Sequence, residues 1–290
     1  MSARHFIEIC GEVASGNSQL YWYAIADSAQ DASLPEVLSR PSRSLFDAEP
    51  GSPLARKSPH LVDLGPPGRG IKAWEWIARN SSKTPSITVI TSLLSFSPLL
   101  AKLKSCAEII LPDGDMMFFA FWDPAILGTL LGQQDDLTLH VPGPVLTIEQ
   151  RSYFAGVVQR WWYWDRNETI HEIQFNSGAE IVESAPFQLS QTQIDQLVEA
   201  SLPDNLLYFV DLNQPYLLYG MSKRAQYEFV RTSLFSAREI GLESMRDLVN
   251  YVCLMLICKR DNEPNPHIAV LLDRVRDKEL TFDDAMKSLP

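Results

Sequence analysis

Residues 118–127 constrain the fold of this chain more than any other stretch of its sequence. An apolar and aromatic run of strand length, residues 118–122, is followed at once by Asp123 and Pro124 and then by an apolar helix pattern. Asp123 suits an N-cap because its carboxylate can accept hydrogen bonds from the free amides of the first helical turn. Pro124 suits the first helical position, where its missing N–H would have had no partner. The segment therefore predicts a buried strand that passes directly into a helix.

A turn signal precedes this run. Pro112, Asp113, Gly114 and Asp115 stand between two apolar stretches, so they predict a hairpin that joins strands at 106–111 and 116–122. Upstream patterns predict strands at 20–26, 60–64 and 87–91, helices at 71–79 and 99–104, and a capping box at Ser33 and Glu36. Strands that alternate with helices, together with one hairpin, indicate a mixed sheet with helices packed on it.

The pattern changes after residue 139. Residues 145–148, 157–164 and 169–175 have the composition of β segments, and the sequence leaves open whether they extend the first sheet. Ser190 with Gln193 is a capping box, and apolar residues recur at helical spacing after it. We therefore predict an α/β N-terminal lobe and an all-α C-terminal lobe. The predicted ranges are 1–185, with core motifs at 20–132 and a β-rich extension at 139–176, and 186–290.

Composition excludes several classes of protein. The chain has 290 residues, with 25 Lys and Arg against 36 Asp and Glu, and its net charge is −11. Nucleic acids and anionic membranes attract basic surfaces, so neither is expected as the main partner. The N-terminal residues lack the apolar run of a signal peptide, and no apolar stretch approaches the roughly 20 residues of a membrane span. The four cysteines lack metal-ligand or disulfide spacing, which favours a cytoplasmic protein with reduced thiols.

No motif assembles a catalytic, cofactor-binding or metal site. Neither Ser15 nor Ser177 lies in a nucleophile elbow, and no two histidines have metal-ligand spacing on a helix. The glycine-rich stretch 65–70 contains prolines and lacks the Gly-Lys-Ser/Thr of a phosphate loop. The acidic pairs 113/115 and 135/136 are typical of solvated turns. Asp27 ends a strand, where we expect it to bond local backbone.

The most unusual composition is the aromatic cluster Trp161, Trp162, Tyr163 and Trp164. On a strand, alternate side chains face opposite sides, so both faces of this segment are bulky. One interpretation packs one face in the core and the other beneath a helix. The other interpretation makes one face an exposed partner-binding patch, because Trp and Tyr dominate interface hot spots.

Four motifs in the first half of the chain occur in a particular order. A strand-like segment at 23–29 is followed by Leu45-Phe46, by a Pro-x-Leu-Val element at 59–62, and by the aromatic run that ends in Asp-Pro. In this order and spacing the chain resembles the effector-adaptor family of type VI secretion, bacterial chaperones that load toxins onto the VgrG spike. Two arginines usual in that family correspond to Ala120 and Ala125 here. The resemblance implies structural roles for Asp27, Phe46, Pro59, Asp113, Gly114, Phe121, Asp123 and Pro124.

The resemblance implies a non-enzymatic adaptor in the cytoplasm that binds a secreted effector and the C-terminal region of VgrG. It implies no cofactor. Two alternatives stay open on the sequence: a hydrolase that uses carboxylates such as Asp27 or Asp123 in a cleft between the lobes, and an immunity protein that neutralises a toxin.

Overall fold

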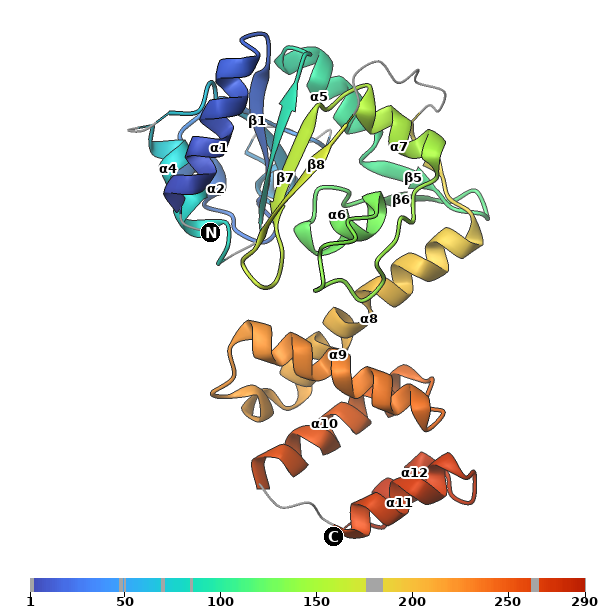
Figure 1. Cartoon of the computed structure of the whole chain (residues 1–290). Helices are drawn as coiled ribbons and strands as arrows, with labels where there is room; N and C mark the ends of the chain where they lie inside the picture. Colours follow the sequence, from blue (N-terminus) through green and yellow to red (C-terminus); the bar gives the residue numbers. More distant parts are fainter. Residues whose placement is uncertain are drawn as a thin grey trace. The chain divides into compact units, whose positions relative to one another are not determined.

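The computed structural model describes residues 3–46, 49, 51–68, 71–83, 86–175, 185–261 and 266–289. The chain divides into two compact units, Met1–Val198 and Glu199–Pro290. The first unit combines sheets and helices and the second is helical, which confirms the predicted fold class (Figure 1). This division by compactness falls inside a helix, α8 (Gln191–Asn213), whereas the domain boundary predicted at 185/186 precedes that helix and stays a prediction.

A six-stranded sheet forms the centre of the first unit, in the order β2-β3-β1-β4-β7-β8. All of its strand pairs are antiparallel. Its members are β1 (Tyr21–Asp27), β2 (Ser42–Ser44), β3 (Pro59–Asp63), β4 (Ile87–Ser92), β7 (Arg160–Trp164) and β8 (Ile170–Gln174). Because β7 pairs with β4, the later β segments extend the first sheet, which answers the question that the sequence left open.

Helices cover both faces of this sheet (Figure 1). One face carries α1 (Ala3–Gly16), α2 (Leu34–Leu38) and α4 (Lys72–Asn80), whose apolar residues form one core with β1 and β4. The other face carries α5 (Phe96–Ser105), α6 (Pro124–Leu131) and α7 (Ile148–Ala155), which form a second core. A short helix, α3 (Pro53–Arg56), precedes β3. A sheet that is covered on both faces buries both sides of its central strands, and β4 is buried along its whole length, including its polar residues Thr88, Thr91 and Ser92.

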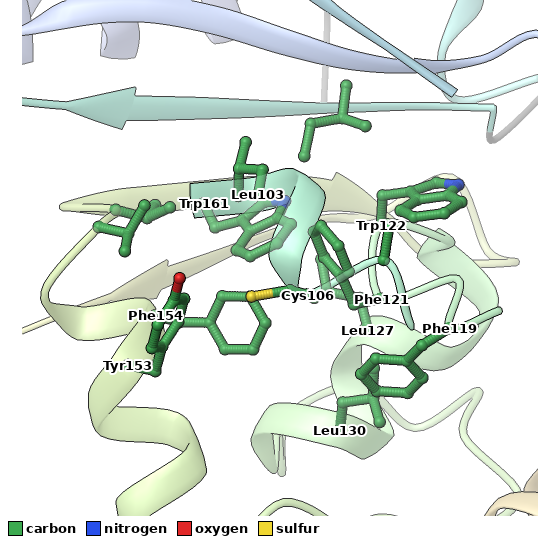
Figure 2. Close-up of a cluster of buried hydrophobic side chains, with 14 of the residues drawn as sticks. Leu103, Cys106, Phe119, Phe121, Trp122, Leu127, Leu130, Tyr153, Phe154 and Trp161 are labelled. Atoms are coloured by element: carbon green, nitrogen blue, oxygen red, sulfur yellow. The ribbon is translucent and has the colours of Figure 1, made fainter. Parts of the chain in front are cut away.

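A smaller sheet of three strands has the order β6-β5-β9, with β5 (Glu108–Ile110), β6 (Met116–Phe118) and β9 (Phe187–Gln188). The pair β5–β9 is parallel and the predicted hairpin joins β5 to β6. Phe119, Phe121 and Trp122, which follow β6, pack against side chains of α5, α6 and α7 in one apolar core (Figure 2). This packing positions the end of β6 against the main body of the unit.

The predicted strand at 116–122 is wrong in its second half. Strand β6 ends at Phe118, and all of its side chains are exposed. The buried residues Phe121 and Trp122 lie instead in a turn, in which the amide of Asp123 donates to the carbonyl of Ala120 at 3.0 Å. Aromatic side chains can be buried from a turn as well as from a strand, so their composition did not reveal the backbone conformation.

Three other local predictions need correction. The β segment predicted at 145–148 is wrong, because helix α7 begins at Ile148 and is capped by Thr147. Ser33 makes no side-chain capping bond at the start of α2, since its hydroxyl donates to Asp31. Helix α5 begins at Phe96 rather than at Leu99. No element was expected at 3–16, where α1 buries Phe6 and Cys10 against the sheet.

Asp123 caps α6 as predicted, since its carboxylate accepts from the amide of Ala125 at 2.9 Å. We expect Asp123→Ala to lower the free energy of unfolding by about 1 kcal/mol, the usual cost of a lost N-cap. Urea unfolding followed by tryptophan fluorescence measures this loss. Asp123→Asn keeps an oxygen acceptor at the cap and should retain most of the stability, so an equal loss in both variants would contradict the capping role.

The second unit consists of helices. Besides the C-terminal part of α8, it contains η1 (Pro215–Leu218), α9 (Lys223–Glu239), α10 (Met245–Asp261), α11 (Pro266–Arg276) and α12 (Phe282–Lys287). The predicted capping box at Ser190 is confirmed, because its hydroxyl accepts from the amide of Gln193 while that side chain accepts from the amide of Ser190. Val252 and Leu256 lie in a separate apolar core of this unit. No helix in the described ranges has the length and apolar character that crossing a membrane requires.

Candidate partner-binding surface

The sequence motifs of the first unit meet at one place. Strand pairing sets Asp27, the last residue of β1, opposite Pro59, the first residue of β3. The indole of Trp122 donates to the Asp27 carboxylate at 3.3 Å, and the same carboxylate accepts from the amide of Ala29. The ring of Phe46 lies 6.0 Å from that of Trp122. Motifs that are far apart in the sequence therefore fix the ends of two strands to the turn before α6.

The remaining motif residues also have structural positions. Phe121 is fully buried, and its ring packs against Phe154 and Trp161 at centroid distances of 5.5 and 6.0 Å. Asp113 and Gly114 form the hairpin turn, where Gly114 has a φ of 91° that disfavours other residues. Pro124 occupies the first turn of α6.

The aromatic cluster of β7 is buried on both faces of the sheet. Trp162 and Trp164 lie in the core beneath α1 and α4, whereas Trp161 and Tyr163 lie in the core beneath α5–α7. The most exposed of the four retains only 5% of its accessible surface. The interpretation as an exposed partner-binding patch is therefore corrected, because sheet and helices cover both faces of the strand. These residues support the fold.

Strand β2 leaves one edge of the large sheet unpaired. The amide of Leu45 donates to the carbonyl of Pro59, and the amide of Asp63 donates to the carbonyl of Pro41. The residues whose backbone groups face β3 for hydrogen bonding are therefore 41, 43 and 45. In an antiparallel pair the intervening residues direct their N–H and C=O groups the other way. The backbone groups of Ser42 and Ser44 therefore point outward, and no backbone hydrogen bond to them occurs among the described residues.

A hollow of about 470 Å³ lies along this edge, and we call it the β2 groove. The described residues of its lining lie in or next to α2, β2, α3, β3 and α5 and are Ala32, Pro35, Glu36, Ser42, Arg43, Ser44, Phe46, Gly51, Ala55, Arg56, His60, Leu100 and Lys104. Among these described residues three are cationic and one is anionic, in a chain whose net charge is −11. The groove is thus a basic region on an acidic protein.

His60 adds no charge to the β2 groove at neutral pH. Its Nδ1 lies 2.9 Å from the carbonyl oxygen of Ser58, so this nitrogen carries the proton and donates. Burial lowers the pKa of His60, and the bond to Ser58 opposes that shift only partly. The cationic character of the groove therefore comes from Arg43, Arg56 and Lys104.

Next to the groove lies an exposed apolar strand. Met116, Met117 and Phe118, which we call the β6 strip, expose 59%, 47% and 59% of their surface. The ring of Phe118 packs on Phe46 with a centroid distance of 4.6 Å, so the β6 strip adjoins the lining of the groove. Strand β6 is also an edge of its sheet. Exposed apolar edges favour association with another chain.

The helical unit has exposed apolar side chains of its own. Within residues 208–219, Tyr208, Leu212, Tyr216 and Tyr219 expose between 49% and 76% of their surface. Tyr208 and Leu212 are four residues apart on α8 and share a face of the helix. The guanidinium of Arg260 lies over the ring of Tyr216 at 5.8 Å. Tyrosine and arginine are enriched in interfaces, so this segment is a second candidate for partner contact.

The strongest candidate for chemistry is a buried cluster near β7 and β8. Asp136, Asp165 and His171 each place one donor atom within 4.8 Å of the other two, which is close enough for a shared cation. Asp136 is buried, so its interpretation as a solvated turn residue is wrong. It accepts from the amide and hydroxyl of Thr138, and from the hydroxyl of Tyr163 at 2.9 Å. Burial and the neighbouring Asp136 charge raise the pKa of Tyr163, which stays a donor.

Hydrogen bonds within the fold engage both carboxylates of this cluster and one nitrogen of His171. Asp165 accepts from the amides of Asn167 and Thr169, both at 2.8 Å, and its other oxygen lies 3.1 Å from Nε2 of His171. Nδ1 of His171 makes no hydrogen bond among the described residues, but it lies 3.4 Å from a carboxylate oxygen of Asp135, within ion-pair distance. A ring nitrogen without a proton would direct its lone pair at a carboxylate, so the geometry favours a doubly protonated ring. We interpret the cluster as a structural network.

The motif residues can be recognised in the sequence, whereas the surface beside them cannot. Of the residues that the family resemblance singles out, Phe46 is the one in the described lining of the β2 groove. Asp27 and Asp123, the carboxylates considered for a hydrolase, are both used as hydrogen-bond acceptors within the fold. Arg43 and Arg56 carry no motif in the sequence, and only the pairing order of the strands reveals that they flank an unpaired edge.

Comparison with known proteins adds one finding. No significant match exists among curated proteins or solved structures. Residues 22–140, which contain all four motifs, the β6 strip and most of the large sheet, match the model of the family described as Domain of unknown function (DUF4123), a family associated with the effector adaptors of type VI secretion.

Proposed function

We propose that this protein is a non-enzymatic adaptor of the cytoplasm that binds a type VI secretion effector and helps to load it onto the VgrG spike. The observation that carries the proposal is the family match over residues 22–140. The buried acidic cluster supports it too, because its groups are engaged in the fold rather than directed at a substrate.

The exposed surfaces are compatible with this role. An adaptor must hold its cargo and its target, so it needs more than one surface for partners. The first unit offers the β6 strip and the β2 groove, and the helical unit offers the exposed side chains of 208–219. Covering apolar groups of an effector would also hold it in a soluble state that is competent for loading, since buried apolar surface is the main driving force for association.

An affinity pull-down of the tagged protein from its own cytosol, followed by mass spectrometry, tests the proposal. We expect a VgrG protein and a toxin to be recovered together. If the secretion apparatus is demonstrably expressed and neither protein is recovered, the adaptor function is wrong. If the toxin alone is recovered and the protein protects cells from it, the protein is an immunity protein.

The β6 strip gives a sharper prediction. We expect Met116→Ser combined with Phe118→Ser to reduce recovery of a partner by about tenfold or more, because apolar anchors at interfaces contribute ~2 kcal/mol each. The melting temperature should change by only a few degrees, since both side chains are mostly exposed. Ile148→Ser removes a comparably exposed apolar side chain elsewhere and serves as the control. Unchanged recovery of both partners would exclude the strip as a contact.

A further inference from the structure

We propose that the β2 groove binds an extended, acidic segment of the effector, which pairs with β2 as an additional strand of the large sheet. This inference rests on the proposed adaptor function, because the effector is its partner. Three independent features of the groove support it: an unpaired backbone edge, an excess of positive charge, and an apolar surface at one end.

The backbone edge determines the conformation of the bound segment. Ser42 and Ser44 direct their N–H and C=O groups away from β3, as the register of the β2–β3 strand pair requires. An extended peptide can satisfy these groups through its own backbone, as in recognition by β-strand addition. The groove lies along this edge, so a paired strand would have room for its side chains.

The charges determine the side chains of the bound segment. Arg43 and Arg56 are exposed, and neither has an ion pair in the described part of the chain. These two guanidinium groups outnumber Glu36, the one carboxylate among the described residues of the lining. Arginine forms paired hydrogen bonds with carboxylates, so Asp and Glu side chains are the natural complement. A protein with a net charge of −11 would otherwise repel an acidic peptide, and this groove offers it a favourable site.

Phe46 provides the apolar contact. It is half-buried and lies two residues after β2, with Leu100 and Ala55 also in the lining. An apolar side chain of the bound strand can pack there, next to the acidic side chains that the arginines hold. The other edge of the sheet differs, because on β8 the carboxylate of Glu172 is paired with Arg160. Only the β2 edge in the described sheet therefore combines unpaired backbone with excess positive charge.

The first test uses a probe peptide and the full-length protein. A fluorescein-labelled peptide of alternating Glu and Val with one central Phe is titrated with protein, and its anisotropy is followed. We expect binding that is at least about tenfold tighter than that of a twin peptide with Lys in place of Glu. Equal binding of the twins, or tighter binding of a labelled oligothymidine, would overturn the proposal.

The variant R43E/R56E tests the position of the site. We expect it to weaken binding of the Glu peptide by about tenfold or more, with an unchanged melting temperature because both arginines are exposed. The variant K223E/R224E changes the net charge by the same amount and lies in the helical unit, none of whose described residues lines the groove. Equal weakening in both variants would mean that only the overall charge matters and would overturn the proposal.

Hydrogen exchange distinguishes strand addition from simple charge attraction. If the peptide pairs with β2, amides in the segment 42–46 should exchange more slowly in its presence, and methylation of alternate peptide nitrogens should abolish the effect. Binding without this protection would contradict the added strand. The pull-down separates the two proposals: if the wild-type protein recovers the effector and R43E/R56E recovers it equally well, the groove inference fails while the adaptor function stands.

Discussion

Replacing Trp162 by Ala is expected to lower the free energy of unfolding of the first unit by about 3–5 kcal/mol, the usual cost of deleting a large buried aromatic side chain. Trp162 is 2% exposed, and its ring stacks on that of Trp22 at a centroid distance of 5.5 Å and an interplanar angle of 12°. Trp22 in turn meets Trp74 of α4 edge to face. The substitution would leave a cavity between the sheet and its helices.

Urea unfolding followed by tryptophan fluorescence measures this loss. All seven tryptophans lie in the first unit, so the signal reports on that unit alone. Ile148→Ala removes an apolar side chain that is 72% exposed and should change the stability by less than about 0.5 kcal/mol. A stable Trp162→Ala variant that no longer captured a partner would restore the interpretation of this cluster as a binding patch.

The fold could be predicted where a local pattern sufficed. The β-branched run at 87–91 predicted β4, and Asp123-Pro124 predicted the start of α6. Both predictions succeeded because side-chain shape and capping chemistry act within a few residues. The same reasoning failed at Phe121 and Trp122. Their burial was predicted correctly, but a turn buries them as well as a strand does.

The candidate surface depends on relations that no local pattern contains. Ser42 and Ser44 have outward backbone groups because β3 is the one strand of the described sheet that pairs with β2. Likewise, the β7–β8 hairpin brings Asp165 close to His171, whereas Asp136 belongs to the loop after α6 and becomes their neighbour only in the folded unit. The sequence shows which residues are charged or apolar, whereas the topology decides which of them become neighbours.

That network leads to a prediction with a defined pH dependence. Replacing His171 by Gln is expected to lower the free energy of unfolding by about 3 kcal/mol at pH 6, because it removes a buried charge partner of Asp165. Burial opposes protonation of His171, but the bond to Asp165 and the charges of Asp136, Asp165 and Asp135 outweigh it, so its pKa is raised. A raised pKa means that the folded state binds the proton more tightly than the unfolded state does.

The stabilisation is therefore fully present below the ordinary histidine pKa of about 6.5 and is lost as the pH rises through the raised value. The difference in unfolding free energy between wild type and His171→Gln should shrink from pH 6 to pH 9. His60→Gln is the matched control, and its trend should be opposite: burial lowers the pKa of His60, so any stability that it contributes is lost as the pH falls. Urea unfolding at several pH values separates the two cases. A His171→Gln difference that stayed constant or grew towards pH 9 would show that the ring is neutral in the folded protein, and the cluster would then need another cation to balance its carboxylates.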